Sequence, residues 1–422
     1  MNTDPTRLVA TTVALPEPPD LLAHAGDDGI LFRDEHGGLA GRGEAVRIEL
    51  PGGLADPASV AKVVRVLSQI HTDDPLGQPG TGPVAIGALP FDPAAPGHLV
   101  VPRRIFGRSG DRGWLTTVEP YDAGPDPVVL GPGRSDCQPP ARSPCQLPDG
   151  FRLTPTMTHT EWREVVADAV ERIEAGDLSK VVLARRIDIE ANRPFVVSDV
   201  LERLAALYPS CMVYSVEGFV GASPELLIRR SGDVVESHPL AGTVARSGDT
   251  HGDELLVARL MDTPKIRHEH RVVVEAIAAS LAPACASLDV PDRPSVLGLR
   301  NVSHLATPIA GRLRPAQHPP SALELAARIH PTPAVGGSPT DEAVRYLQKV
   351  EGFDRGRYAG PVGWVDARGD GCFALGIRCA EVAGPTARIY AGNGIVAGSD
   401  SADELAETQL KLQALLAALV RP

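Results

Sequence analysis

The feature that most constrains this fold is the order of its helix-like and strand-like patterns, which fall in separate runs along the chain. Thr158 and Glu161 have the spacing of a capping box, and apolar residues then recur at helical intervals as far as Gly176. Short β-branched or apolar runs predict strands at 180–185, 225–229, 373–380 and 387–396. Two more helices are predicted, at 264–281 and from Ser401 onward. Separate runs with hairpin-like spacing indicate an α+β fold with antiparallel sheets.

A stretch rich in proline and glycine, residues 121–150, interrupts these patterns. It predicts a long irregular connection, either a linker between two domains or a surface excursion within one. A chain of 422 residues can form one large domain or two ordinary ones. The residues alone leave both arrangements open.

The composition limits the kinds of partner that this protein can bind and indicates the compartment in which it works. A net charge of −12 argues against a nucleic-acid partner, which would favour a basic face, and an anionic substrate would need local lysine, arginine or metal. The six cysteines form no C-x-x-C pair, which favours scattered reduced thiols. The first residues lack a signal-peptide core and no run of 18 apolar residues occurs, so we expect a cytoplasmic protein that does not span a membrane.

One carboxylate does not fit a simple amphipathic helix. Glu269 falls on the same stripe as Ile266, Val273 and Ile277 of the 264–281 helix. A carboxylate on an apolar stripe is seldom buried without a partner. The alternative is that the face is misassigned by one residue and that Glu269 points to solvent.

The last helix carries a second acidic group. Glu404, Glu407 and Lys411 lie at i, i+3 and i+7 and share one face. A purely structural alternative is favoured by the spacing: Ser401 and Glu404 would form a capping box, and Glu407 and Lys411 an ordinary salt bridge. If this face met Glu269, the oxygen-only ligand set would suit Mg²⁺.

Two strand residues and a set of glycines complete the candidates. Lys180 alternates with apolar residues and could act as a base, although such lysines often extend to solvent. Glu225 precedes an apolar run and, if desolvated, could stay protonated and serve as an acid. The glycines at 391–394 and 336–337 could present backbone N–H groups to an anion or mark simple turns.

Several ordered segments between about residue 161 and residue 415 resemble the chorismate-utilising enzymes. This family contains isochorismate synthases, salicylate synthases and the large subunit of anthranilate synthase. The matching segments are SKVVLAR (179–185), GASPELL (221–227), HPLAGT (238–243), HEH (268–270), NVSHLAT (301–307), HPTPAVGG (330–337), RYAGPVGWVD (357–366), IRCA (377–380), AGNGI (391–395) and ELAETQLK (404–411). GALPFD (87–92) in the N-terminal part is also similar.

The resemblance implies one large domain over residues 1–422, with two pseudo-symmetric halves, facing antiparallel sheets and helices packed outside. Residues 1–120 would contribute to this fold, 121–150 would connect within it, and 155–420 would carry the catalytic core. The resemblance assigns the base to Lys180 and the acid to Glu225. It implies Mg²⁺ binding by Glu269, Glu404 and Glu407, and substrate contacts by Gly242, Thr243, His304, Ala334, Tyr358, Arg378, Gly392, Gly394 and Lys411.

Two positions indicate the type of reaction. Lys180 stands where the ammonia-using relatives usually carry Gln, so water is the implied nucleophile. Ala334 stands where relatives that release pyruvate usually carry Thr. The implied activity is the isochorismate synthase reaction, in which water attacks C2 of chorismate and the C4 hydroxyl leaves. Cys372 and Asn393 depart from common residues of the family, and both are expected near the carboxylate pocket.

The resemblance also implies which partners the protein has and which alternative functions are open. Chorismate is the expected substrate, no glutaminase subunit is expected, and a monomer is implied. Salicylate synthase or another chorismate lyase of the family is one alternative, and a catalytically silent chorismate-binding homologue is another. Menaquinone, siderophore and salicylate-derived products all remain open as the use of the product.

Overall fold

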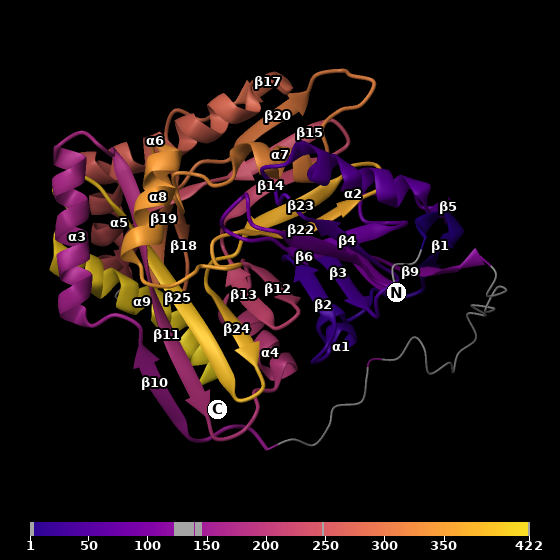
Figure 1. Ribbon diagram of the computed structural model, residues 1–422, viewed down its shortest axis with the longest axis horizontal. Coiled ribbons are helices and arrows are strands. Elements are labelled where there is room, and N and C mark those ends of the chain that lie inside the picture. The colour runs from indigo at the N-terminus through magenta and orange to yellow at the C-terminus, as the bar shows by residue number, and fades with distance from the viewer. Residues whose placement is uncertain (1–3, 122–138, 140–145, 247–248, 421–422) are drawn as a thin grey trace.

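The computed structural model describes residues 4–121, 139, 146–246 and 249–420, and two large sheets organise them (Figure 1). Most of the 121–150 connection therefore lies outside the described residues. In the described part, no helix is long and apolar enough to cross a membrane. Four cysteines there are free and buried: Cys211, Cys285, Cys372 and Cys379.

The larger sheet has thirteen strands within the described residues, and only its β1–β5 pair is parallel. In spatial order, its strands are β10 (Phe151–Pro155), β11 (Lys180–Ala191), β25 (Thr386–Ile395), β24 (Cys379–Ala383), β13 (Phe219–Ser223), β12 (Met212–Val216), β2 (Ile30–Arg33), β3 (Gly37–Arg42), β8 (Arg104–Ser109), β9 (Arg112–Pro120), β1 (Leu8–Leu15) and β5 (His71–Asp73). The short β21 (Gly337–Ser338) pairs with the start of β11.

The second sheet has nine strands in the described part and is antiparallel throughout. Its spatial order is β17 (Cys285–Asp289), β20 (Ile309–Leu313), β15 (Val234–His238), β14 (Leu226–Ser231), β23 (Gly371–Leu375), β22 (Pro361–Asp366), β6 (Val84–Ala88), β7 (Gly97–Val101) and β4 (Val46–Leu50). A small third sheet is formed by β16 (Leu240–Ala245), β19 (Val302–Ala306) and β18 (Ser295–Gly298).

The helices lie around these sheets. They are η1 (Pro5–Arg7), α1 (Leu21–Ala25), α2 (Pro57–Gln69), α3 (His159–Glu174), α4 (Val197–Leu207), α5 (Thr250–Asp262), α6 (Pro264–Leu281), α7 (Ala322–Ile329), α8 (Thr340–Val350) and α9 (Ser401–Leu419). Figure 1 shows α3, α5, α6 and α8 near the upper part of the β11–β25 pair, and α9 running along the pair toward the C-terminus at its lower end. The α+β prediction is confirmed.

Both large sheets combine strands from the two sides of the 121–150 connection. In the larger sheet, β2 pairs with β12 through Phe32 and Tyr214. In the second sheet, β6 pairs with β22 through Ile86 and Trp364. Residues 1–120 thus complete two sheets that the rest of the chain also builds, and they do not form a separate layer.

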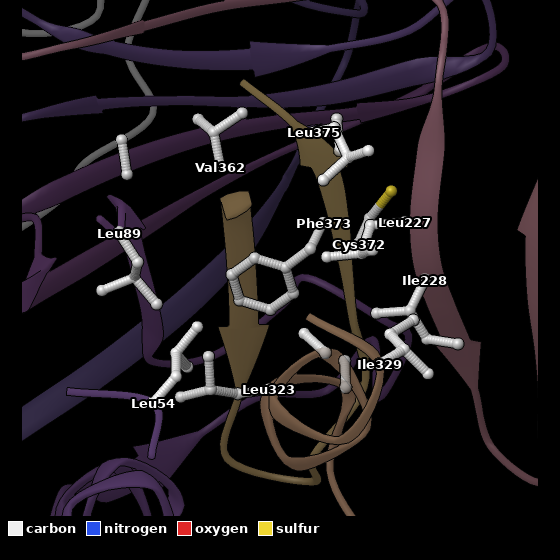
Figure 2. Close-up of a cluster of buried hydrophobic side chains, with 14 of the residues drawn as sticks. Leu54, Leu89, Leu227, Ile228, Leu323, Ile329, Val362, Cys372, Phe373 and Leu375 are labelled. Carbon is white, nitrogen blue, oxygen red and sulfur yellow. The ribbon is translucent and has the colours of Figure 1, made fainter. Parts of the chain in front are cut away.

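Alternation along the strands of the larger sheet separates two hydrophobic cores. Phe32 and Trp114 face a core shared with the second sheet, whereas their neighbours Leu31 and Leu115 face a core covered by α1, α4 and α9. On the second sheet, Phe373 of β23 lies in a cluster that includes Leu323 of α7 (Figure 2). The apolar faces of both large sheets are therefore covered, which fixes their register.

Most predicted elements are confirmed. The Thr158–Glu161 capping box opens α3, and Gly176 follows its end with a φ of 87°. The 264–281 helix and the 387–396 strand are present as α6 and β25. The 225–229 strand lies one or two residues later, as β14. The 180–185 strand is much longer than predicted, because β11 pairs with β25 as far as Glu190.

The single strand predicted at 373–380 is wrong. The chain forms β23 in the nine-stranded sheet, turns at Gly376, and forms β24 in the thirteen-stranded sheet. Arg378 lies in the turn with a φ of 50°, which a continuous strand would not allow. The crossing from one sheet to the other is a long-range feature that local β propensity does not report.

Candidate active site

A polar cavity of about 280 Å³ lies at the start of β11 and the end of β25. Its walls come from β11, β16, β19, β25, α5, α6, α9, the link between β13 and β14, and the turn around Arg378. All fourteen site residues predicted from the sequence line it. It also collects five basic side chains in a chain of net charge −12: Lys180, Arg259, Lys265, Arg378 and Lys411. Local cations thus offset the unfavourable overall charge for an anionic ligand.

Glu225 is a buried carboxyl group in the wall of this cavity. Its side chain is 4% exposed, and its Oε1 accepts the N–H of Leu240 at 3.3 Å. Burial raises the pKa of Glu225 to about 8, against smaller lowering effects of the Leu240 N–H and the charges of Lys180 and Arg378. Glu225 is therefore largely protonated at neutral pH and can donate a proton.

Lys180 lies at the start of β11 and forms an ion pair with Glu269 of α6. Its Nζ is 3.0 Å from Glu269 Oε1, and the two side chains are 1% and 14% exposed. The alternative in which Glu269 points to solvent is therefore wrong. Gly394 makes the pair possible, because a Cβ at that position would lie 2.1 Å from Glu269 Oε1 and 2.9 Å from Lys180 Cε.

Arg378 is oriented by His304. Arg378 Nη2 lies 3.1 Å from His304 Nε2, and because a guanidinium can only donate, Nε2 is the acceptor. The ring proton is then on Nδ1, which lies 3.2 Å from the carbonyl oxygen of Gly242 and 3.1 Å from Thr243 Oγ1. Burial, with Arg378 and Lys411, holds the pKa of His304 well below its usual range. The imidazole is neutral and supports Arg378.

The backbone of β25 offers an open edge to the cavity. Its pairing with β24 ends at Ile389, so the following residues of β25 have no strand on that side. Lys411 Nζ donates to the carbonyl oxygen of Gly392 at 2.9 Å, which shows that Gly392 faces away from β11. By alternation, the N–H groups of Gly392 and Gly394 point to this open edge. They can bind an anion there, beside the ammonium of Lys411.

Three further predicted residues shape the cavity. The Tyr358 ring stacks on Tyr390 at 4.8 Å between centroids, and a Cβ on Gly392 would lie 2.8 Å from its hydroxyl. Gly242 has a φ of 73°, and a Cβ there would lie 2.4 Å from Ile266 Cγ2. Ala334 donates its N–H to Thr332 Oγ1 at 3.2 Å, which orders the loop around it. Glycine at positions 242 and 392 thus allows the backbone to pack closely against Ile266 and Tyr358 in the cavity wall.

The three glutamates predicted to bind a metal share the cavity, but each is close to a lysine. Besides the pair at Glu269, Glu404 Oε1 is 3.8 Å from Lys265 Nζ, and Glu407 Oε1 is 2.6 Å from Lys411 Nζ. Burial raises the pKa of Glu404 to about 7, and the charges of Glu407 and Glu269 add to it. Within the described residues, no three acidic, His or Cys side chains converge closely enough to form a metal site as they stand.

The donor set nevertheless suits a hard divalent cation. It contains only carboxylate oxygens, and the mutual repulsion seen at Glu404 is the kind that a bound cation relieves. The predicted capping box at Ser401 and Glu404 is wrong, because Asp400 caps α9 through the N–H groups of Ala402 and Asp403. The side chain of Glu404 is thereby left to face the cavity.

Sequence reasoning missed a buried ion pair behind the cavity. Glu351 and Arg355 are 3% and 4% exposed, and both carboxylate oxygens of Glu351 contact the guanidinium. Arg355 also donates to the carbonyl oxygens of Val182 and Val335, while Glu351 accepts the N–H of Ala184. The pair supplies hydrogen-bond partners for the backbone of β11 between the residues that pair with β21 and those that pair with β10. Its i,i+4 spacing was the only signal, and that spacing is typical of exposed helix pairs.

The two departures from the family pattern lie in different places. Asn393 contacts Lys411 and the backbone of Glu404, as expected for a residue near the carboxylate pocket. Cys372 does not line this cavity, so the expectation for it is wrong. Its thiol belongs to β23 and lies beside a second cavity of about 300 Å³ between the two large sheets. Burial raises its pKa to about 11.

Comparison with known proteins identifies the family. The family model described as "Chorismate binding enzyme" matches residues 30–420. The chain belongs to the chorismate-binding enzymes. It is 36% identical over 348 residues to isochorismate synthase DhbC of Bacillus subtilis, covering 80% of this chain and 81% of that protein. It is 38% identical over 355 residues to putative isochorismate synthase MenF of Mycobacterium tuberculosis, covering 81% and 87%.

Solved structures of chorismate-binding enzymes share the fold. A putative 2,3-dihydroxybenzoate-specific isochorismate synthase, DhbC from Bacillus anthracis, matches with a TM-score of 0.78 and 34% identity, covering 94% of this chain and 98% of that one. The menaquinone-specific isochorismate synthase MenF from Escherichia coli matches with a TM-score of 0.79 and 25% identity, covering 98% and 95%.

Proposed function

We propose that this chorismate-binding enzyme is an isochorismate synthase, which exchanges the C4 hydroxyl of chorismate for a hydroxyl at C2. The observation that carries the proposal is the buried carboxyl of Glu225, whose pKa burial raises to about 8, in one cavity with Lys180. An acid and a base in one water-restricted pocket are what such an exchange requires. Relatives that are named isochorismate synthases and that align over most of the chain support the same activity.

Glu225 is the proposed general acid. Hydroxide is a poor leaving group, so the C4 hydroxyl must be protonated as its bond to carbon breaks. Glu225 holds a proton at neutral pH because its carboxyl is buried. Its Oε1 is engaged by the Leu240 N–H, which leaves Oε2 to carry the proton toward the substrate.

Lys180 is the proposed general base for the attacking water. Its amine must be neutral when it accepts a proton from that water, which attacks C2 as the ring double bond shifts. Its Nζ forms an ion pair with Glu269 in the cavity wall and its Cε lies close to Gly394, so its position is fixed to one side of the ligand space. Positioned proton transfers of this kind typically contribute about 10²–10⁴ in rate.

Chorismate has two carboxylates, and the cavity has two sets of groups for them. We assign one carboxylate to Arg378 and Tyr358, with His304 holding the guanidinium in place. We assign contacts to the other carboxylate to Lys411 and the N–H groups of Gly392 and Gly394. Gly242, Thr243 and Ala334 are assigned to the ring pocket between them.

Glu269, Glu404 and Glu407 are the proposed Mg²⁺ ligands. When bound there, Mg²⁺ would neutralise the C1 carboxylate and supply Lewis-acid assistance to the shift of ring electrons. The three side chains would have to leave Lys180, Lys265 and Lys411 in part, since each is within 4 Å of one of these lysines. Substrate and metal binding are therefore expected to be coupled.

Ala334 supports the reaction without pyruvate release. It lines the ring pocket where lyases of the family usually carry Thr, so the cavity has no hydroxyl at that position. We also propose that the enzyme acts as a cytoplasmic monomer on free chorismate, without a glutaminase subunit. The product could enter menaquinone, siderophore or salicylate-derived biosynthesis, since similar proteins are named as specific for menaquinone, as specific for vibriobactin and for salicylate biosynthesis.

The test is product analysis of the purified protein by chromatography, with chorismate as substrate, with and without Mg²⁺, together with a pyruvate assay. Isochorismate in equilibrium with chorismate, formed only with Mg²⁺ and without pyruvate, is the expected outcome. Salicylate or anthranilate with pyruvate would instead favour the lyase alternative and refute the role given to Ala334. No turnover would favour a silent chorismate-binding homologue.

A further inference from the structure

Asn393 lies directly behind the predicted carboxylate pocket. Its neighbours Gly392 and Gly394 line the cavity, whereas Asn393 projects from the other face of β25 toward α9. Its side chain is 1% exposed. A buried polar side chain at this place needs partners, and they identify its role.

The amide of Asn393 is held between opposite charges. Lys411 Nζ lies 3.0 Å from Oδ1, and because an ammonium can only donate, the amide oxygen must face it. Nδ2 then faces Glu404, where it donates to the backbone carbonyl at 2.7 Å and to the carboxylate Oε2 at 3.2 Å. All of these groups are buried or half-buried, so the orientation of the amide is fixed.

These contacts compete with others in the same pocket. Lys411 is also within 2.6 Å of Glu407, and Glu404 is also 3.8 Å from Lys265. The amide oxygen draws Lys411 toward β25, beside Gly392, and the amide N–H fixes one oxygen of Glu404. The other oxygen of Glu404, Oε1, is the one that lies 3.8 Å from Lys265 Nζ.

We propose that Asn393 is a positioning residue that sets Lys411 for the substrate carboxylate and Glu404 for the divalent cation. This inference rests on the proposed function and deepens it. Asn393 is not among the residues that line the cavity, so it acts only through the two charged side chains. It thereby links the carboxylate pocket to the cation site through a single neutral side chain.

Asn393→Leu and Asn393→Ala separate hydrogen bonding from packing. The leucine variant keeps nearly the same volume but has no polar atoms, whereas the alanine variant loses both. Asn301→Leu is the matched control, because Asn301 Nδ2 also donates to a backbone carbonyl of α9, that of Leu410, at 2.8 Å. Asn301 does not line the active-site cavity.

The measurements are the Kd for Mg²⁺ by calorimetry without substrate, and kcat and KM for chorismate at saturating Mg²⁺. In both Asn393 variants we expect the Kd and the KM each to rise about tenfold, since hydrogen bonds to charged groups are lost. We expect kcat to change much less, and Asn301→Leu to leave the Kd and KM unchanged.

Three outcomes would overturn the inference. The first is an Asn393→Leu variant with the Kd and KM of the unmodified enzyme, which would reduce the role of Asn393 to packing. The second is an Asn301→Leu variant with the same losses, which would make the effect a general one of anchoring α9. The third is a loss confined to kcat. Failure of the proposed function would look different, because the unmodified enzyme would then form no isochorismate while its Mg²⁺ titration could still be compared with the variants.

Discussion

Two ion pairs, one partly buried and one fully buried, lie at the first residues of β11, and they differ in how completely their charges are satisfied. Among the described residues, Lys180 has one ion-pair partner, Glu269, and both side chains line the cavity. In the second pair, Arg355 makes two contacts with Glu351 and donates to two backbone carbonyls, and Glu351 accepts a backbone N–H. Neither member of the second pair lines the cavity.

This difference separates an ion pair that can take part in the reaction from an ion pair that stabilises the structure. A pair whose hydrogen-bonding capacity is filled by the protein is stabilised in one geometry and has nothing to offer a ligand. A pair with capacity left, in a cavity, can exchange partners when substrate or metal arrives. The Glu351–Arg355 pair also replaces a neighbouring strand for Val182 and Ala184 of β11, and through Val335 it reaches the loop that carries Ala334. It therefore braces both the strand of Lys180 and the loop beside it, whose Gly336 carbonyl accepts the N–H of Val182.

The largest effect is expected from Lys180→Ala. Loss of the base should lower kcat by about 10²–10⁴. The melting temperature should change little, because Glu269 faces the cavity and can be solvated there. Steady-state kinetics and thermal unfolding measure the two quantities, with Lys62→Ala, an exposed lysine, as the control. An active Lys180→Ala enzyme would mean that another group is the base.

Arg355→Met should have the opposite effects, a large loss of stability and a smaller change in kcat. Removing one partner of a buried ion pair typically costs about 3–5 kcal/mol of stability, which urea unfolding would measure. Replacing both partners, in Glu351→Leu with Arg355→Met, usually restores stability when a pair is isolated. Here we expect no recovery, because the backbone groups of Ala184, Val182 and Val335 would lose their partners. A double variant as stable as the unmodified protein would show that the Glu351–Arg355 pair is not needed as a hydrogen-bond partner of the backbone.

The pH dependence should report Glu225. The reaction needs its protonated form, and burial raises its pKa to about 8. Below that pH the acid is present, and above it the fraction of enzyme with a protonated Glu225 falls about tenfold for each further pH unit. Lys180 must be neutral in the same step, so kcat/KM should stop rising above this pH and should fall once Lys180 is neutral. The pH–rate profile between pH 6 and 10 measures this. A kcat/KM that keeps rising from pH 8 to pH 10 would contradict the assignment of Glu225 as the acid.

The smallest effect is expected from Ala334→Thr. A hydroxyl at this position in the ring pocket should divert a minor part of turnover to pyruvate release, with little change in the rate of chorismate consumption. A coupled pyruvate assay on the same reaction mixtures detects it. Ser338→Thr, in β21 of the same region, offers a control outside the cavity lining. If pyruvate stays at background in Ala334→Thr, this residue does not decide between isomerase and lyase chemistry.

Local sequence patterns determined the individual elements where one short-range signal was sufficient. The capping box at Thr158, the proline in the first turn of α6 and the β-branched runs at Lys180 and after Glu225 predicted α3, α6, β11 and β14. These signals depend on neighbours within one or two turns, so a linear reading can find them. The site residues were named through the resemblance to a family, and the structure brings all fourteen to one cavity.

Only the tertiary structure decided how those elements meet. The crossing between β23 and β24 places Arg378 in the site, yet the sequence there was read as one strand. The orientation of Glu269 depends on Lys180, which is distant in the chain. The burial of Glu351 and Arg355 depends on contacts with β11 and with Val335. The cap of α9 is local, but two neighbouring residues, Asp400 and Ser401, could both have served, and the structure shows that it is Asp400. The pKa of Glu225 depends on the same long-range packing, because desolvation depends on everything that surrounds a group. The sequence by itself therefore determined which groups are available, and the packing of the two sheets decided which of them face a substrate.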